Sequence, residues 1–492
     1  MCSCARARNG GKLPGMKGSS RFFLSLAILF LGTAPKARCA ETPGSVDLSF
    51  DVGVLGGIQF YNPGFGTVIG LALGQNDEIY IGGHFTDFVQ PEPLQGKDWN
   101  GLARLNGDGT LDESFAVPVF DQSSPLPGHI DAHKIFVQDD GTVWAGYSLF
   151  SWRFRSDGGI YPVSTNQQFR SIVKVYPDGR FLEGGSWTVR RCLPDGSTDT
   201  SFSQFTGEQE ARIILRDGRV LNAARSERFA GTIASGFLNR LNENGTVDSS
   251  YLRPNFTTNG IEGLGLFLER PNGQVYVAGE FTEVNGKPFS RLIRLNEDGT
   301  LDENFRPDAR LTGTNAPKVL AMALQPNGKL LLGGDFSKSE APIAAGIVRL
   351  NTDGSIDTSF DPGTGVSEGH DTEQFPWFQA KVVNIEVQND GKILVAGDFR
   401  KFNGIARDGI VRLQGDPVEP LRIVGISRSN EGRITLDFTG TFEVVEVQES
   451  AELDGEWRAV AVKEAGGENS VRIEVGDTGG AETARFFKIR RR

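Results

Sequence analysis

A two-hairpin module recurs along this chain, and it constrains the fold more than any other feature of the sequence. The first half is an alternating apolar strand, a tight turn and a second strand that ends in Gly-Gly or Ala-Gly. The second half is a strand of apolar and basic residues, another tight turn and a short strand that ends in Phe. Asn-Gly and Asp-Gly between alternating strands predict hairpins, because Asn, Asp and Gly accept positive φ. Clear copies of the first half are 264–281, 319–336 and 382–399, and clear copies of the second half are 103–115, 293–305 and 348–360.

Seven copies of the module predict an all-β fold. Their first turns are 38 to 64 residues apart, about 52 on average. A period near 50 residues with four antiparallel strands per unit is typical of a β-propeller with one blade per repeat. The 63 glycines agree with a turn-rich β protein. We therefore predict a seven-bladed β-propeller. The first turns lie at Asp77, Gly141, Gly179, Gly218, Gly273, Gly328 and Gly391.

The patterns LNxDGxxDxSF and DGKxxxGGxF resemble those of the delta-60 repeat family of secreted bacterial β-propellers. The resemblance covers residues 44–416; it is clear in copies one, five, six and seven and weak in copies two to four. It implies a propeller fold and brings no catalytic residue set with it.

The two ends of the repeat region predict how the ring closes. The seventh copy contains the strand at 410–414 but lacks the short strand that ends in Phe. The segment SVDLSF at 45–50 supplies this missing strand at the other end of the repeat region. Because an open ring would expose unpaired strand edges, we expect 45–50 to pair with 410–414.

Three further regions precede or follow the predicted propeller in the sequence. Residues 1–40 combine basic residues, an apolar stretch at 22–31 and small residues, which is the order found in a secretory signal. Pro-rich residues 417–420 are the expected linker. Residues 421–492 contain six short strand patterns, which predict a small β-sandwich. This region weakly resembles the C-terminal sandwich modules of secreted bacterial proteins.

Net charge and composition limit the classes of partner and the location that we expect for the protein. The first forty residues hold seven of the 51 basic residues and none of the 62 acidic ones, so the remaining chain has a net charge of −18. Such a chain repels phosphate backbones, so we expect no nucleic-acid partner. No segment after residue 40 has the apolar length of a transmembrane helix. We expect a secreted or periplasmic protein, or one at the cell surface. The basic end KIRRR could contact an acidic surface, although a solvated edge strand also explains it.

Two sets of polar side chains are candidate cation sites. The Asn-x-Asp-Gly-x-x-Asp turns, for example Asn106, Asp108 and Asp112, offer oxygens at calcium-like spacing, but tight turns need the same residues. A second set lies at the ends of the second strands, where it could line one mouth of the channel or merely cap loop amides. We expect no cofactor, with calcium as the alternative. The weak metal candidates of this second set are His84, Glu280, Asp335 and Asp398.

Strand parity predicts where a ligand would bind. In an antiparallel four-stranded blade the first and third turns share one face, while the second turn and the connection to the next blade share the other. The long segments 86–101, 116–133 and 361–380 therefore all fall on one face, over blades seven, one and two. Loops also lengthen without a binding role. The candidate ligand residues are Trp99, His129, Asp131, His133, His370, Glu373 and Trp377.

Two functional hypotheses follow. The first is a secreted, non-enzymatic binding or scaffold protein that recognises a glycan or protein through this face. The alternative is an extracytoplasmic hydrolase, lyase or lactonase with a carboxylate-lined, metal-dependent site at the channel mouth. The sequence contains no GxSxG, HExxH, P-loop or CxxC motif and only four histidines, so we assign no catalytic residue.

Overall fold

A computed structural model provides the structure of the chain. The structure describes residues 42–56, 67–74, 76–85, 87–89, 101–118, 132–146, 151–161, 172–185, 188–206, 209–226, 234–258, 264–289, 291–312, 316–336, 343–369, 379–428, 434–441, 444–450, 458–464, 470–475 and 486–491.

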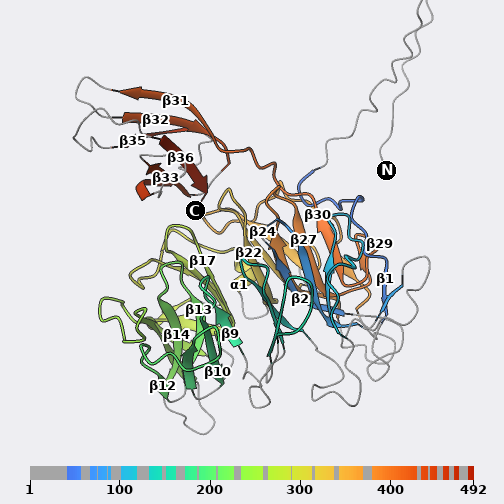
Figure 1. Cartoon of the computed structure of the whole chain (residues 1–492), viewed down its shortest axis with the longest axis horizontal. Coiled ribbons are helices and arrows are strands. Elements are labelled where there is room, and N and C mark those ends of the chain that lie inside the picture. Colours follow the sequence, from blue (N-terminus) through green and yellow to red (C-terminus); the bar gives the residue numbers. More distant parts are fainter. Residues whose placement is uncertain are drawn as a thin grey trace, which may run out of the picture. The chain divides into compact units, whose positions relative to one another are not determined.

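Seven antiparallel sheets, one for each copy of the module, form most of the described chain (Figure 1). In each sheet the second strand lies between the first and the third. Within the described residues the only helix is the short α1 (Ala309–Thr312), so the predicted all-β class is confirmed. We call the sheets repeats 1 to 7. Their strands are β2 (Thr67–Leu73), β3 (Ile79–His84) and β5 (Leu102–Leu105); β6 (Lys134–Val137), β7 (Val143–Gly146) and β8 (Ser151–Phe154); β9 (Ile172–Val175), β10 (Phe181–Gly185) and β11 (Thr188–Cys192); β13 (Gln209–Ile214), β14 (Val220–Ser226) and β15 (Ala234–Leu241); β17 (Leu266–Glu269), β18 (Val275–Ala278) and β21 (Leu292–Leu295); β22 (Lys318–Leu324), β23 (Leu330–Asp335) and β24 (Ile347–Leu350); β26 (Lys381–Val387), β27 (Ile393–Asp398) and β30 (Ile410–Leu413).

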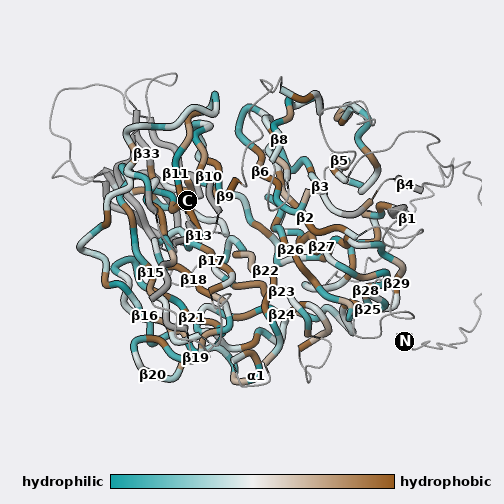
Figure 2. Tube along the Cα trace, turned by 90° about the horizontal axis from the view of Figure 1, so that it is seen from below, coloured by the Kyte–Doolittle hydropathy of each residue, from teal (hydrophilic) through white to brown (hydrophobic). Residues whose placement is uncertain are grey.

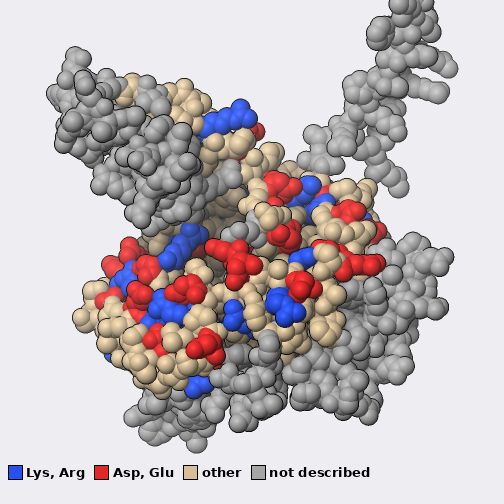
Figure 3. Space-filling model, viewed as in Figure 1, with Lys and Arg blue, Asp and Glu red and all other residues tan. Residues whose placement is uncertain are grey.

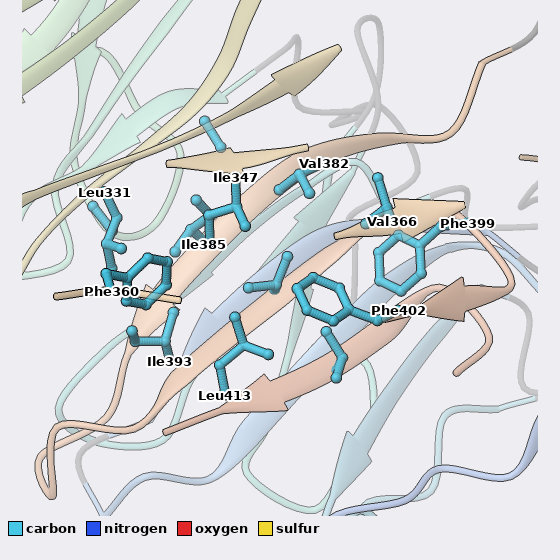
Figure 4. Packing of buried hydrophobic residues seen from close by; sticks show 14 of the residues in the cluster. Leu331, Ile347, Phe360, Val366, Val382, Ile385, Ile393, Phe399, Phe402 and Leu413 are labelled. Carbon is cyan, nitrogen blue, oxygen red and sulfur yellow. The ribbon is translucent and has the colours of Figure 1, made fainter. Parts of the chain in front are cut away.

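The apolar core lies between successive sheets. First strands contact one another in the order β6, β2, β26, β22, β17, β13 and β9, and in Figure 2 they surround a common centre. Repeats 2 and 3 meet through a cluster that contains Trp144 and Phe181. Figure 4 shows the cluster between repeats 6 and 7, where Leu331 and Ile347 face Ile385 and Ile393. Each sheet therefore buries both of its faces against its neighbours, which explains why second strands are almost wholly apolar.

The short strand that ends in Phe differs from the prediction. In repeat 1 the segment after the third turn makes a single bridge, from Leu111 to Leu105, and then turns away. The turn forms because the carboxylate of Asp112 accepts hydrogen bonds from the backbone and hydroxyl groups of Ser114 (2.9 and 2.6 Å). The predicted four-stranded blade is thus a three-stranded sheet with a bridged turn. In repeats 3 and 4 a fourth strand does pair with the third, but it follows this turn: β12 (Phe205–Thr206) and β16 (Asn255–Thr258).

An arginine in the third strand, buried in repeats 3 to 7 and half-buried in repeats 1 and 2, connects each repeat to the next. In repeat 5, Arg294 Nε donates to Asp302 Oδ2 at 2.7 Å, and Nη1 donates to the carbonyl of Thr352 in repeat 6 at 2.6 Å. The guanidinium carbon lies 4.8 Å from the centroid of the Phe305 ring. The same arrangement explains why the module needs a basic third strand, a turn and the Asp-x-Ser-Phe segment. We call these residues the inter-repeat arginines: Arg104, Arg153, Arg191, Arg240, Arg294, Arg349 and Arg412.

Residues near the N-terminal end of the described chain contact the third strand of repeat 7. Val46 forms an antiparallel bridge with Leu413, and the backbone amide of Asp47 donates to Arg412 O at 2.8 Å. Arg412 Nε donates to Asp47 Oδ2 at 2.8 Å, as the equivalent arginine does to its Asp in repeats 1 and 3 to 6. Arg412 Nη1 also reaches the carbonyl of Gly107 in repeat 1 at 2.5 Å. Segment 44–47 therefore takes the position that the turn after the third strand has elsewhere.

The sequence analysis did not predict several additional short strands. In these, a segment that connects two repeats pairs with a strand or hairpin that follows the second strand. In repeat 7 the hairpin turns at Asn403-Gly404 with φ of 49° and 73°, and in repeat 5 at Asn285-Gly286 with φ of 52° and 71°. Asn and Gly accept these angles, and the dipeptide was the available sequence signal. The strands are β1 (Val54–Gly56) with β4 (Asp87–Val89); β16 with β19 (Phe281–Val284) and β20 (Lys287–Pro288); and β25 (Val366–Ser367) with β28 (Lys401–Phe402) and β29 (Ile405–Ala406).

The C-terminal region contains the six predicted strands in two three-stranded antiparallel sheets. Leu436, Phe438 and Val447 are fully buried. Within this region and its linker, Glu419 and Thr441 exchange two hydrogen bonds. An independent sandwich domain stays a prediction. The strands are β31 (Arg422–Arg428), β32 (Ile434–Thr439) and β35 (Ser470–Val475) in one sheet, and β33 (Val444–Ser450), β34 (Arg458–Glu464) and β36 (Phe486–Arg491) in the other.

Candidate functional site

First and third turns lie together on one side of the repeats, as strand parity predicts. Arg219, next to the first turn of repeat 4, forms an ion pair of 3.0 Å with Glu297 in the third turn of repeat 5. Asn327, in the first turn of repeat 6, donates to Asp416 beyond the third strand of repeat 7 at 2.7 Å. We call this side the turn face. The opposite side, where first strands begin and second strands end, is the loop face.

Most predicted ligand residues lie outside the described chain. His133 is described, and it directly precedes β6 at the loop face, where its amide donates to Gly146 O at 3.0 Å. This backbone bond extends the pairing of β6 with β7 and fixes the position of His133 at the start of a first strand. The structure therefore positions one of the seven predicted residues. The other six, which lie outside the described residues, are Trp99, His129, Asp131, His370, Glu373 and Trp377.

Two of the four weak metal candidates are cross-strand neighbours of lysines at the loop face. Asp335 at the end of β23 is paired in register with Lys318, the first residue of β22. Asp398 at the end of β27 is paired in the same way with Lys381. A lysine directly opposite a carboxylate disfavours the binding of a cation there.

The two remaining candidates occupy the equivalent positions of repeats 5 and 1. Glu280 lies 3.8 Å from the Nζ of Lys318, and both side chains are half exposed. His84, the last residue of β3, is paired in register with Thr67. Among the described residues, no group of three or more His, Cys, Asp or Glu side chains has the geometry of a metal site.

The turn carboxylates that have calcium-like spacing are engaged within the chain. Asp108 Oδ1 accepts bonds from the amide and hydroxyl of Thr110 at 3.0 and 2.7 Å. Asp112 uses one oxygen for Ser114 and the other for Arg104 Nε at 2.7 Å. These contacts are what a structural turn requires, and they leave few lone pairs for a cation.

Equivalent residues on the seven first strands form a set that we call the collar, and two of its members are charged. Five residues before each first turn, five of the seven repeats carry an apolar residue, whereas repeat 3 carries Lys174 and repeat 7 carries Glu386. Lys174 Nζ lies 5.5 Å from the centroid of the Phe136 ring in repeat 2. Lys174 and Glu386 are both partly exposed even though they are on innermost strands. The collar is Ala72, Phe136, Lys174, Ile213, Leu268, Ala323 and Glu386.

Burial among these apolar neighbours shifts both charged groups toward neutrality. It raises the pKa of Glu386 to about 7, against the opposing attraction of Lys174. It lowers the pKa of Lys174, and repulsion from Lys134 acts in the same direction. The charged group that acts on Glu386 is Lys174. A carboxyl group that titrates near neutral pH can accept or donate a proton, so the collar has acid–base capacity that the sequence analysis missed. The available signal was a charged residue in an otherwise apolar column of the repeats.

Charges elsewhere on the described surface are mixed. Figure 3 shows basic and acidic side chains interspersed on the side in view. Among the described residues, no helix has the length and apolar character needed to cross a membrane.

Four segments of the chain match the family "Domain of unknown function (DUF5122) beta-propeller", and this confirms the resemblance to a β-propeller repeat family. They are 75–115, 270–305, 325–360 and 388–416, which correspond to repeats 1, 5, 6 and 7. Repeats 2 to 4 lie outside the matched segments. No curated protein matches this chain in sequence.

Solved structures that this chain resembles in part include three proteins. An extracellular domain from B. thetaiotaomicron has 12% identity and a TM-score of 0.45; the alignment covers 80% of this chain and 45% of that chain. Hsv2 from Kluyveromyces lactis has 9% identity and a TM-score of 0.38, over 81% of this chain and 99% of that one. A gluconolactonase from Xanthomonas campestris has 12% identity and a TM-score of 0.31, over 56% and 82%.

Proposed function

We propose that the chain is an exported β-propeller that binds a glycan or a protein through its loop face and performs no reaction. One observation carries the proposal: the inter-repeat arginines make their bonds on the turn face, whereas the segments 86–101, 116–133 and 361–380 meet β3, β6 and β26 at strand ends on the loop face. Long segments on a rigid scaffold are where binding residues concentrate. His133, at the start of a first strand, is placed to contribute to such a site.

The aromatic residues in these segments would supply most of the binding energy. Trp99 and Trp377 offer large apolar surfaces for a sugar ring or a protein side chain. Asp131, Glu373 and the histidines His129, His133 and His370 would form hydrogen bonds around them. We expect Trp99→Ala/Trp377→Ala to reduce affinity for a ligand found on a glycan array at least tenfold. Trp457→Ala, in the C-terminal region, is the matched control. Unchanged affinity in the double variant would disprove this role.

The proposal includes a closed ring of seven blades. It is supported by the bridge of Val46 with Leu413 and by the bond from Arg412 to Gly107, because these join the two ends of the repeat region. Deletion of 41–52 should expose the edge of β30 and cause aggregation. The proposal also includes a separate domain at 421–492, so limited proteolysis near 415–420 should release a stable propeller.

A second function is favoured by the position of Glu386, a carboxyl group on the first strand of repeat 7 where five of the seven repeats carry an apolar residue. In this alternative the chain is an extracytoplasmic hydrolase, lyase or lactonase, and Glu386 is its acid–base group. A lactone and ester hydrolysis screen of the wild type and of Glu386→Gln tests it. Activity that falls at least a hundredfold in the variant would favour the enzyme. Metal analysis of the purified protein tests calcium, and Asp335 and Asp398 are the residues to substitute if calcium is found.

A further inference from the structure

A cavity of about 280 Å³ lies on the turn face between repeats 4 and 5, far in sequence from the predicted loop-face site. Its walls come from the first turns of both repeats and from the third turn of repeat 5. Leu215, Leu221 and Val275 supply an apolar wall, and Tyr251 contributes to the same lining. The volume is close to the lower limit of small-molecule pockets in proteins.

Glu269 gives this cavity its distinct chemistry. It is the last residue of β17, four residues before the first turn, and lines the cavity. The six other repeats carry apolar residues at this position, among them Ile214 in repeat 4 and Leu324 in repeat 6. Glu269 is half-buried, and burial raises its pKa although the backbone amide of Arg216 donates to Oε2 at 2.7 Å. An ionisable group in a column of apolar residues costs stability and needs a compensating role.

The remaining charges of the cavity balance. Arg219 is held by Asp217 and Glu297, and Arg240 by Asp248. Arg216 is exposed, and its charge attracts the carboxylate of Glu269. Three arginines and three carboxylates line the cavity, so it has no net charge to attract an anion or a cation. It does present a carboxylate acceptor, a guanidinium donor and an apolar wall.

We propose that this cavity binds a neutral monosaccharide. Glu269 accepts hydrogen bonds from hydroxyl groups, Arg216 donates to ring or hydroxyl oxygens, and Leu215 and Val275 contact the C–H face of the sugar. Charge-assisted hydrogen bonds of this kind are about twice as strong as neutral ones, which would supply specificity in a small site. The site lies on the turn face, so it is independent of the loop-face function proposed above.

A charged ligand would interact with only part of the cavity lining. A cationic ligand would be favoured if Glu269 acted without the arginines, and an anionic ligand if Arg216 and Arg219 acted without the carboxylates. The balanced lining favours neither. Binding of glucosamine or glucuronate can therefore be compared directly with that of the neutral sugar of the same size.

The test is saturation-transfer NMR and calorimetry on the full chain with glucose, galactose, mannose, glucosamine and glucuronate. We expect at least one neutral hexose to bind, and each charged sugar to bind at least threefold more weakly. Glu269→Leu restores the residue class of the other repeats, so it should fold normally and lose at least tenfold in affinity. Arg216→Ala keeps the backbone amide that contacts Glu269 and should also weaken binding.

Glu243→Gln is the matched control, because Glu243 occupies the third turn of repeat 4 at the position equivalent to Glu297 but does not line the cavity. It should bind like the wild type. Absence of binding for all three hexoses, tighter binding of a charged sugar, or unchanged affinity in Glu269→Leu would each overturn the proposal. Because Trp99→Ala/Trp377→Ala leaves this cavity intact, failure of one proposal is distinguishable from failure of the other.

Discussion

Repeats 1, 5, 6 and 7 match the family, and repeats 2, 3 and 4 do not. One residue pair is apolar in the matched repeats and polar in repeats 3 and 4, whereas repeat 2 keeps an apolar pair, Ala145 with Trp152. The pair joins the third residue of the second strand to its neighbour on the third strand. It is Ile81 with Ala103 in repeat 1 and Val277 with Ile293 in repeat 5. In repeat 3 the same pair is Glu183 with Arg190, and in repeat 4 it is Asn222 with Asn239.

The inter-repeat arginines, by contrast, are present in both groups. Repeat 2 shows how far the surrounding residues can change. Tyr161 occupies the position of the usual Asp, and the centroid of its ring lies 4.4 Å from Arg153 Cζ. Arg153 Nη1 still donates to Pro194 O at 3.0 Å. The difference teaches that the bonds of the turn face define the repeat geometry, whereas the buried pair can become polar without loss of the sheet.

The largest expected effect comes from removing an inter-repeat arginine in each group. Arg294→Met in repeat 5 leaves Asp302 buried without its main partner, so we expect a loss of about 3–5 kcal/mol in the free energy of unfolding. Arg153→Met in repeat 2 leaves no carboxylate behind and should cost about 1 kcal/mol. Urea unfolding measures both.

Arg294→Met/Asp302→Leu serves as the control, because removing both charges should recover much of the loss. Equal losses in Arg294→Met and Arg153→Met would contradict the expected difference between repeats 5 and 2.

The sequence predicted the sheets and their order because alternation and Asn-Gly or Asp-Gly turns are local signals. It did not predict the arginine–aspartate pairs, although an eight-residue spacing such as Arg294 to Asp302 recurs in the printed sequence. It also missed the collar, because a lone Glu386 or Lys174 gains meaning only when seven first strands are brought together. The loop-face site could be located only by strand parity, since its residues lie in segments without repeated patterns.

The second effect concerns two residues of the collar. Glu386 belongs to repeat 7, which matches the family, and Lys174 belongs to repeat 3, which does not. The pKa of Glu386 is about 7 in the folded chain, above the ordinary glutamate value of 4.5. Between these values the unfolded chain has released the proton while the folded chain still holds it, so stability falls as pH rises from about 4.5 to 7. Glu386→Gln should remove this fall and raise the free energy of unfolding at pH 8 by about 2–3 kcal/mol.

Lys174→Met sharpens this measurement. Lys174 lowers the pKa of Glu386 by attraction, so its loss should extend the fall in stability to higher pH. Identical pH profiles in the wild type and Glu386→Gln would show that the carboxyl group is solvated like an ordinary glutamate.

A smaller effect tests the buried pair itself. Asn222 is fully buried, and neither of its side-chain polar atoms has a hydrogen-bond partner in the described structure. Replacing it together with its neighbour, as Asn222→Val/Asn239→Ile, restores the pair of repeat 5 and should stabilise the chain by about 1–2 kcal/mol. The reverse change, Val277→Asn/Ile293→Asn, should destabilise it by more than this amount. Thermal unfolding distinguishes the two, and destabilisation by the first variant would show that the amides have partners.

The smallest effect concerns the hairpins of the matched repeats 5 and 7. Asn403 has a φ of 49°; its amide donates to Gly365 O at 2.7 Å and its Oδ1 accepts from the amide of Thr364 at 3.3 Å. Asn403→Ala loses the side-chain bond and places Ala in a left-handed conformation, so we expect a loss of about 1–2 kcal/mol. Asn403→Gly accepts the same φ and loses only the bond, so it should cost about half as much. Asn285 makes the equivalent bonds to Asn255, and its variants should follow the same order. Hydrogen exchange of the Thr364 amide reports the bond directly, and unchanged protection in Asn403→Gly would show that the backbone turn alone holds the connecting segment.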